Sequence, residues 1–280
     1  MSWTTLITAE ALLGIPACDV VVVDCRHQLT DPAYGRRAYA AGHLPGARFM
    51  HLDDDLSGQK SGQNGRHPLP VAEVLAAKLA SAGIADDTQV VAYDDAGGMF
   101  AARLWWLLRW LGHEKVAVLD GGLAAFERAG GVLTTDVPAS AAGSFSIRPS
   151  LEKTVSAADI LAADELLVLD ARAPGRYAGE GETLDPVGGH IPGARNYFFQ
   201  QNLEADGCFK SPESLKAAFG AVLAGVSLDR VVNQCGSGVT ACHNLLAMQH
   251  AGLSGSRLYP GSWSEWCADP ARPVATGPNP

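Results

Sequence analysis

The segment "NQCGSGVTACHN" places Cys235 in a glycine-bearing turn between an apolar strand-like run and an apolar helix-like run. Gly236 and Gly238 allow successive backbone N–H groups to curl toward the cysteine sulfur at a helix N-terminus. Val239 and Thr240 complete the turn and lead into the helix. Because such donors stabilise a thiolate, the turn predicts an anion-binding nest around a nucleophilic cysteine.

The remaining cysteines have no comparable setting. They show no CxxC pair and no Cys/His ligand spacing, so the sequence predicts free thiols without a disulfide framework or a zinc site. Free cysteines are among the most buried residue types, and packing is their ordinary role. We therefore predict packing for Cys18, Cys25, Cys208, Cys242 and Cys267.

One pattern occurs twice along the chain. Residues 20–48 and 166–195 both contain an apolar run, then Asp-x-Arg, then Gly-His-(Leu/Ile)-Pro-Gly-Ala-Arg. Downstream, "QVVAYDDAGGMFA" aligns with "RVVNQCGSGVTA", and Asp95 then occupies the position of Cys235. A tandem duplication is indicated, in which one copy kept a nucleophile and the other lost it.

The elements around these motifs predict an α/β fold. Each copy alternates short β-branched runs with amphipathic helical windows, which is typical of parallel strands covered by crossover helices. We expect two tandem domains, each a small parallel sheet flanked by helices. The expected boundaries are 1–137 for the silent domain, 138–155 for the linker and 156–280 for the catalytic domain.

Capping signals predict two of the helices in detail. "VAEVLAAKLASAG" is expected to be a helix that ends at Gly83, and "SPESLKAAFGAVLAG" one capped by Ser211 with Pro212 at its first position. The Ala-, Ser-, Gly- and Pro-rich stretch 134–150 has no sustained period and predicts a connector. "RLWWLLRW" is interpreted as a core or interdomain helix.

Composition excludes several classes of protein. The 280 residues are 47% hydrophobic and 18% charged, with a net charge of −9 and no cluster of Lys or Arg. This balance argues against a nucleic-acid partner. The beginning of the sequence lacks the features of a signal peptide. The most apolar helix expected anywhere in the chain is too short to span a bilayer. We therefore expect a cytoplasmic protein without a membrane partner.

The two Asp-x-Arg…Gly-His-x-Pro-Gly-Ala copies and "CGSGVTA" together resemble the tandem-domain rhodanese superfamily of sulfurtransferases. The resemblance covers nearly the whole chain. It implies that Cys235 takes a sulfane sulfur from 3-mercaptopyruvate or thiosulfate, forms a persulfide and passes the sulfur to an acceptor. Cyanide, a thiol or a thioredoxin-like protein would be the acceptor, and neither a cofactor nor a metal is implied.

The neutral loop "CGSGVTA" is similar to the loop found in the mercaptopyruvate branch of this family. The loop of the thiosulfate branch instead has basic residues after the cysteine, as in "CRKGVTA". The resemblance implies that Ser237 works with a histidine, matched to His67 in "GRHPLP", and with an aspartate. Asp55 is the best match for the aspartate, although Asp53 and Asp54 are alternatives.

The same branch implies two arginines that bind the substrate carboxylate. Arg176 in "PGRYAG" matches the first, and a guanidinium suits a carboxylate through its bidentate fork. Thr183 stands where the second is expected. We therefore expect 3-mercaptopyruvate as donor, with thiosulfate:cyanide transfer as the alternative.

Two other classes of protein share parts of this pattern. A non-catalytic rhodanese-like sulfur carrier or binding module is a third possibility, and a cysteine phosphatase is disfavoured because Ala241 stands where that class needs an arginine. Three motif positions recur in both copies, which predicts structural roles for them. These are the turn-bracing histidines His43 and His190 and the ion pairs Asp24/Arg26 and Asp170/Arg172.

Overall fold

The computed structural model describes residues 2–139, 142–163 and 165–280, which form two compact units. The first unit comprises residues up to Gly58, Pro70–Leu151 and Glu204–Phe209. The second comprises Gln59–Leu69, Glu152–Leu203 and Lys210–Pro280. Each unit therefore includes a short segment that lies, in sequence, among the elements of the other.

The first unit contains a parallel sheet with the strand order β1-β5-β4-β2-β3. Its longest strands are rich in valine and are covered on both sides, as expected for parallel strands. The strands are β1 (Leu6–Ile7), β2 (Val20–Asp24), β3 (Arg48–Phe49), β4 (Gln89–Tyr93) and β5 (Val116–Leu119).

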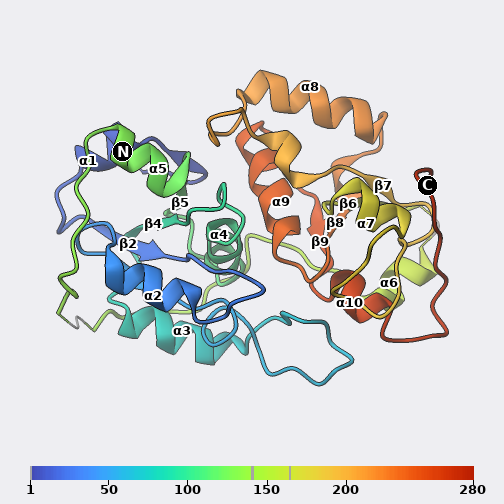
Figure 1. The fold of residues 1–280 in the computed structure, drawn as a ribbon, viewed down its shortest axis with the longest axis horizontal. Coiled ribbons are helices and arrows are strands. Elements are labelled where there is room, and N and C mark those ends of the chain that lie inside the picture. Colours follow the sequence, from blue (N-terminus) through green and yellow to red (C-terminus); the bar gives the residue numbers. More distant parts are fainter. Residues whose placement is uncertain (1, 140–141, 164) are drawn as a thin grey trace. The chain divides into compact units, whose positions relative to one another are not determined.

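Helices surround this sheet (Figure 1): α1 (Ala9–Leu13), α2 (Tyr34–Ala41), α3 (Ala72–Ser81), α4 (Ala101–Trp110) and α5 (Gly122–Arg128). Leu12 of α1 and Phe126 of α5 share a buried cluster with Val22, Val91 and Leu119 of the strands. Helix α4 packs against β4 and β5, and all of its residues except the last are buried. The prediction that this tryptophan-rich helix belongs to a core is confirmed.

The second unit repeats the plan with the order β7-β6-β8-β9, again all parallel. The strands are β6 (Leu167–Asp170), β7 (Arg195–Asn196), β8 (Val231–Gln234) and β9 (Arg257–Leu258). The helices are α6 (Ala157–Ala162), α7 (Pro174–Ala178), α8 (Pro212–Leu223), α9 (Thr240–His250) and α10 (Ser262–Trp266), with 3₁₀ turns η1 (Phe199–Asn202) and η2 (Leu228–Arg230). The predicted α/β class with two small parallel sheets is thus confirmed.

Both helices predicted from capping signals are present. Helix α3 ends just before Gly83, whose φ of +83° suits glycine, and the Ser211 hydroxyl accepts the Ser214 N–H at the start of α8. Within the connector 134–150, residues 140–141 lie outside the described part of the chain, and the described remainder contains no helix or extended strand.

Strand register corrects one prediction about the duplication. Asp24 lies opposite Tyr93, and its counterpart Asp170 lies opposite Gln234. The residue after β4 that matches Cys235 is therefore Asp94, and the predicted equivalence with Asp95 is wrong by one residue. The physical reason is a longer turn in the first copy, where residues 94–100 join strand to helix, against 235–239 in the second.

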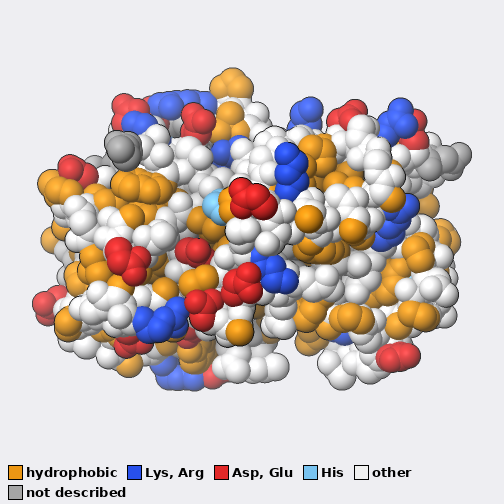
Figure 2. All heavy atoms as spheres, turned by 90° about the horizontal axis from the view of Figure 1, so that it is seen from above, with side chains coloured by type: hydrophobic (Ala, Val, Ile, Leu, Met, Phe, Trp, Pro, Cys, Tyr) orange, Lys and Arg blue, Asp and Glu red, His pale blue; other side chains and the backbone are white. Residues whose placement is uncertain are grey.

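Charged side chains of both signs are interspersed on the molecular face drawn in Figure 2. Among the described residues, no helix combines the length and the apolar character needed to cross a bilayer.

Candidate active site

Cys235 is the first residue after β8 and is buried. Its sulfur accepts the N–H of Ser237 at 3.5 Å, and its own N–H donates to the Ser262 hydroxyl at 3.1 Å. Its carbonyl accepts the N–H of Trp263 at 2.9 Å. The sulfur therefore lies at the carboxyl edge of a parallel sheet, with a backbone donor pointing at it, as the sequence pattern predicts.

The loop glycines make close approaches that a side chain would block. Gly238 has a φ of +76°, and a Cβ there would lie 2.4 Å from the carbonyl oxygen of Pro260. A Cβ on Gly236 would lie 2.7 Å from Nη2 of Arg66 and 3.4 Å from Nη1 of Arg176. Two guanidinium groups therefore lie directly beside the residue that follows the cysteine.

The structure brings together Ser237 and His67, which the resemblance had paired. The distance from Nδ1 of His67 to Oγ of Ser237 is 2.7 Å, and both side chains are buried. His67 reaches the loop because Gln59–Leu69 belongs to the second unit.

Asp55 belongs to the first unit. Its carboxylate accepts the N–H of His51 at 2.8 Å and lies 3.0 Å from Nζ of Lys78. Its predicted partnership with His67, and the choice among Asp53, Asp54 and Asp55, stay predictions.

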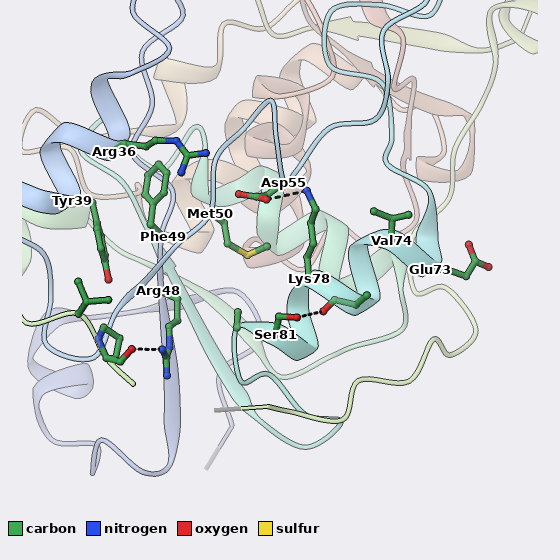
Figure 3. Close-up of a pocket in the computed structure, with 14 residues that line it drawn as sticks. Arg36, Tyr39, Arg48, Phe49, Met50, Asp55, Glu73, Val74, Lys78 and Ser81 are labelled. Carbon is green, nitrogen blue, oxygen red and sulfur yellow. Dashed lines mark hydrogen bonds and ion pairs between the residues drawn. The ribbon is translucent and has the colours of Figure 1, made fainter. Parts of the chain in front are cut away.

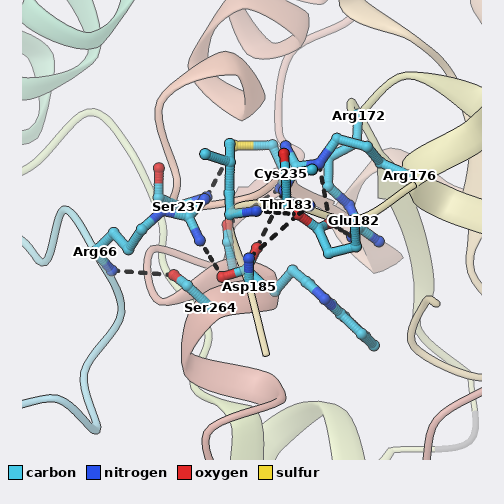
Figure 4. A network of polar contacts seen from close by, with 12 residues as sticks. Arg66, Arg172, Arg176, Glu182, Thr183, Asp185, Cys235, Ser237 and Ser264 are labelled. Atoms are coloured by element: carbon cyan, nitrogen blue, oxygen red, sulfur yellow. Dashed lines mark hydrogen bonds and ion pairs between the residues drawn. The ribbon is translucent and has the colours of Figure 1, made fainter. Parts of the chain in front are cut away.

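Arg176 is part of an ion network that extends beside Cys235 (Figure 4). Its Nε and Nη2 bind Glu182 at 2.9 and 3.1 Å, and Nη2 also binds Asp185 at 3.1 Å. Nη1 of Arg66 binds the other oxygen of Asp185. Thr183, at the position where a second arginine was expected, donates its N–H to Glu182.

The two carboxyl groups of this network respond differently to burial. Burial acts to raise the pKa of Glu182, but hydrogen bonds from Arg176 and from the Leu184 N–H outweigh it, so the pKa is lowered. For Asp185, burial dominates over the attraction of Arg66 and raises the pKa. Sequence reasoning missed Glu182, Asp185 and Arg66; the position of Arg66 beside the candidate His67 was the available signal.

The predicted Asp-x-Arg ion pairs are confirmed in both copies. Arg26 and Arg172 each place Nη2 at 2.6 Å from the preceding aspartate, and each also binds a glycine carbonyl of the Gly-His-x-Pro-Gly motif at 2.7 Å. Burial acts to lower the pKa of Arg172, yet Asp170, Glu182 and Cys235 raise it overall. In the second copy, the ion pair of Arg172 with Asp170 thus also provides a buried cation that responds to Cys235, the candidate nucleophile.

The bracing histidines are confirmed as well. His43 stacks on Tyr39, and His190 stacks on Tyr177, each with ring centroids 3.8 Å apart. Each histidine Nδ1 also bonds the carbonyl of its stacked tyrosine, at 2.8 and 2.9 Å. Identical contacts in both copies fit a structural role for the motif.

The other cysteines differ from Cys235. Cys242 lies buried within α9 and donates to the carbonyl of Gly238 at 3.3 Å, which is a packing contact. Burial raises the pKa of Cys25 and of Cys267, and it raises that of Cys208 to about 11, so these thiols resist ionisation.

In the first copy, the carboxyl group of Asp94 fills the turn. Its carboxylate accepts the N–H groups of Ala96, Gly98, Phe100 and Ala101 at 2.8–2.9 Å. Burial raises its pKa, while these donors act in the opposite direction. The turn therefore holds an internal acceptor at the position that Cys235 occupies in the second copy.

A cavity of about 870 Å³ lies within the first unit (Figure 3). Its cationic groups are engaged by the protein: Arg36 binds Asp54, Lys78 binds Asp55, and Arg48 binds two backbone carbonyls of the connector. The cavity therefore offers mainly apolar surface.

One group of possible metal ligands occurs among the described residues, namely His27, His51 and Asp53. Nδ1 of His51 accepts the N–H groups of Asp53 and Asp54, and its Nε2 donates to the Pro32 carbonyl at 2.8 Å. Because both ring nitrogens of His51 are used, the group does not form a ligand set for a metal.

Comparison with known proteins agrees with this geometry. A full-length relative is the "Probable 3-mercaptopyruvate sulfurtransferase" of Pseudomonas aeruginosa, 50% identical over 99% of this chain and 100% of that protein. The thiosulfate sulfurtransferase of Bos taurus is 36% identical over 82% of this chain and 79% of that protein. The structure of 3-mercaptopyruvate sulfurtransferase from Leishmania major superimposes with a TM-score of 0.84 at 30% identity, covering 94% of this chain and 74% of that one.

The family described as "Rhodanese-like domain" matches twice, at residues 8–129 and 154–269. These two segments coincide with the two copies of the Asp-x-Arg…Gly-His-x-Pro-Gly pattern and with the two parallel sheets. The chain therefore belongs to the rhodanese-like domain family, with the domain present twice.

Proposed function

We propose that this chain is a sulfurtransferase that moves sulfane sulfur from 3-mercaptopyruvate to a thiol or cyanide through a persulfide on Cys235. The observation that carries the proposal is the contact of Ser237 with both partners: its N–H points at Sγ of Cys235, and its hydroxyl bonds His67. Full-length similarity to a protein named for this activity supports it.

In the first half-reaction, the Cys235 thiolate attacks the sulfur of 3-mercaptopyruvate. A sulfur–sulfur bond forms, the carbon–sulfur bond breaks, and its electron pair leaves as the enolate of pyruvate. Ser237, hydrogen-bonded to His67, is placed to deliver the proton that converts the enolate into pyruvate. Cys235 is left as Cys–S–SH, which ionises to the persulfide anion.

In the second half-reaction, the acceptor attacks the outer sulfur of the persulfide. The sulfur–sulfur bond breaks, and its electron pair returns to Cys235 as a thiolate. Cyanide leaves as thiocyanate, and a thiol leaves as its own persulfide. The Ser237 N–H at the sulfur stabilises the anionic forms of the cycle.

Thiosulfate is the second candidate donor. Its specific support is the pair of guanidinium groups beside Gly236, since two cations also suit a dianion. Similarity to the Bos taurus thiosulfate sulfurtransferase points the same way. With this donor the leaving group is sulfite, which needs no proton to depart.

Peptide mass spectrometry tests the proposal. After incubation with 3-mercaptopyruvate and gel filtration, we expect one added sulfur on the Cys235 peptide of the wild type. Cys235→Ser should abolish the label, and Cys242→Ser, at a buried packing thiol on the same segment, should retain it. Thiosulfate is tested in a parallel incubation. If neither 3-mercaptopyruvate nor thiosulfate labels the wild type, the chain is a non-catalytic binding module.

The donor preference is tested by kcat/KM for the two donors, measured with the same acceptor. We expect the value for 3-mercaptopyruvate to exceed that for thiosulfate. Equal or greater efficiency with thiosulfate would assign the chain to thiosulfate:cyanide transfer.

Asp55 is proposed to support His67. Asp55→Asn should then lower sulfur uptake from 3-mercaptopyruvate more than Asp54→Asn does, and Asp53→Asn serves as the second comparison. The proposed location is the cytoplasm, where the cysteines would persist as thiols and not form disulfides.

A further inference from the structure

The cavity of about 870 Å³ in the first unit is bounded by α2, α3, the edge strand β3 and the beginning of the connector (Figure 3). Its size is within the range of pockets that hold small molecules. Apolar side chains form much of its wall, among them Tyr39, Phe49, Met50, Val74 and Val137. All of these residues belong to the unit that contains the silent copy. The silent copy therefore has a ligand-sized space of its own.

Two valines of this wall are exposed to solvent. Val74 of α3 is 52% exposed, and Val137 of the connector is 75% exposed. An apolar ligand in the cavity would remove part of this surface from water, which favours binding.

In the second copy, the counterparts of two wall elements are in direct contact. Arg195 is the counterpart of Arg48, because both residues end the repeated motif and both begin an edge strand. Nη1 of Arg195 donates to the carbonyl of Val222, in the last turn of α8, at 2.6 Å. In the first copy, the end of α3 occupies the place of the end of α8, and its residues Ser81 and Ala82 line the cavity.

Arg48 is directed to the connector instead. Its Nη1 donates to the carbonyl of Pro138 at 2.8 Å, and its Nη2 donates to the carbonyl of Ala139 at 2.6 Å. Where the second copy closes the helix end with an arginine, the first copy has a cavity between α3 and the connector.

The partners of Arg48 are neutral, unlike those of the other cations in the wall. Arg36 and Lys78 each form an ion pair with an aspartate, at 2.8 and 3.0 Å. Within residues 2–139, 142–163 and 165–280, no carboxylate forms an ion pair with Arg48. A guanidinium has five N–H donors, so Arg48 retains donors for an anion. Glu73 lies on the other side of the cavity from Arg48 (Figure 3).

We propose that this cavity binds an apolar monocarboxylic acid, whose carboxylate pairs with Arg48 and whose hydrocarbon part packs against Phe49, Met50 and Val74. A guanidinium is well suited to a carboxylate, and the apolar wall suits the hydrocarbon part. A second carboxylate on the ligand would be repelled by Asp55 and Glu73, which also line the cavity. The site does not depend on sulfur transfer.

Isothermal titration calorimetry with octanoate and its neutral counterpart octanamide tests the proposal. We expect the wild type to bind octanoate at one site, about tenfold or more tightly than octanamide, because a charge-assisted hydrogen bond contributes more than a neutral one. Arg48→Gln should lower the affinity for octanoate to that for octanamide. Its affinity for octanamide should differ from that of the wild type by less than about twofold.

Arg195→Gln is the matched control, because it removes the guanidinium at the same motif position of the second copy. It should bind both probes as the wild type does. If Arg195→Gln weakens octanoate binding as much as Arg48→Gln does, the effect is not specific to the cavity and the proposal fails.

Ala77→Trp tests the location of the site separately from its charge. Ala77 is an exposed residue of α3 that lines the cavity, so the helix should tolerate an indole that fills the space. With a circular dichroism spectrum and Tm close to those of the wild type, this variant should bind neither probe. Unchanged octanoate binding in Ala77→Trp would overturn the proposal. Equal affinity of the wild type for the two probes, or no binding of octanoate up to about 10 mM, would do so as well.

Discussion

Ser237 connects the cysteine loop to His67, since its N–H lies at the sulfur of Cys235 and its hydroxyl bonds the imidazole. The enolate carbon that leaves 3-mercaptopyruvate needs a proton to become pyruvate, whereas the sulfite that leaves thiosulfate is already a stable anion. Ser237→Ala should therefore lower kcat with 3-mercaptopyruvate by about 10²-fold and with thiosulfate by much less. Parallel kinetics with the two donors measure the difference, and equal losses would show that Ser237 handles no proton.

Arg172 can be separated from its structural role because the duplication supplies a control. Arg26→Gln and Arg172→Gln remove the same clamp on an aspartate and a glycine carbonyl, so both should lower the free energy of unfolding. Of the two arginines, Arg172 is the one on which Cys235 acts, because it helps to raise the pKa of Arg172. We expect only Arg172→Gln to slow alkylation of Cys235 by iodoacetamide at pH 7, by about threefold or more. Equal rates of Cys235 alkylation in the two variants would show that Arg172 does not influence Cys235.

Sequence reasoning predicted these residues unevenly. Cys235, Ser237 and His67 stand in recognisable motifs, and the structure brings them together. Arg66 could not be predicted, because its contact with Asp185 joins positions 119 residues apart and depends on how a loop folds. The counterpart of Cys235 was predicted at Asp95 and is Asp94. The sequence alignment could not show which residues of neighbouring strands lie opposite each other.

At the scale of elements, the turn between β4 and α4 should depend on Asp94. Asp94→Ala leaves the N–H groups of Ala96, Gly98, Phe100 and Ala101 without their acceptor. We expect a loss of about 3 kcal/mol in the free energy of unfolding, measured in urea, and a smaller loss for Asp94→Asn, which keeps one acceptor.

The emptied turn should also bind an external anion. Sulfate at tens of millimolar should raise the Tm of Asp94→Ala more than that of the wild type, with equimolar chloride as the control for ionic strength. An equal response of both proteins would show that the turn collapses when the carboxylate is removed.

The turn that joins α4 to β5 contains His113, whose burial lowers its pKa although the Thr88 carbonyl acts to raise it. Arg148 and Asp86 also act on it, in opposite directions. Because the native state binds the proton less readily than the unfolded state, the contribution of His113 is complete above pH about 6.5 and is lost as the pH falls. His113→Gln should show a smaller decrease in unfolding free energy between pH 7.5 and 5.5, and an unchanged decrease would assign the pH dependence to other groups.

Prediction of the elements succeeded where the sequence carries a local signal. Valine-rich runs became the central strands, and Ser211 with Pro212 began α8. The edge strands β3 and β7 are only two residues long, and they exist because neighbouring strands offer backbone partners. Their two-residue sequences, Arg-Phe and Arg-Asn, carry no periodicity that could reveal them.

At the scale of the whole molecule, the duplication was predictable and the composition of the packed units was not. The boundaries 1–137, 138–155 and 156–280 follow composition along the chain and stay a prediction. Packing assigns Gln59–Leu69 to the second unit and Glu204–Phe209 to the first. Such assignments depend on tertiary contacts, which a linear pattern does not encode.

Residues 59–69 precede the connector in sequence but pack in the second unit, and this limits how the gene could be divided. A gene break within the connector would yield a 3′ fragment that encodes Cys235 and Arg176 but not Arg66 or His67, and a 5′ fragment that encodes the missing side chains without the nucleophile. Deletion of the first copy would therefore remove Arg66 and His67 from the packed unit that contains Cys235. For the two halves to be inherited separately with both packed units complete, the 3′ fragment would have to encode its own equivalent of residues 59–69.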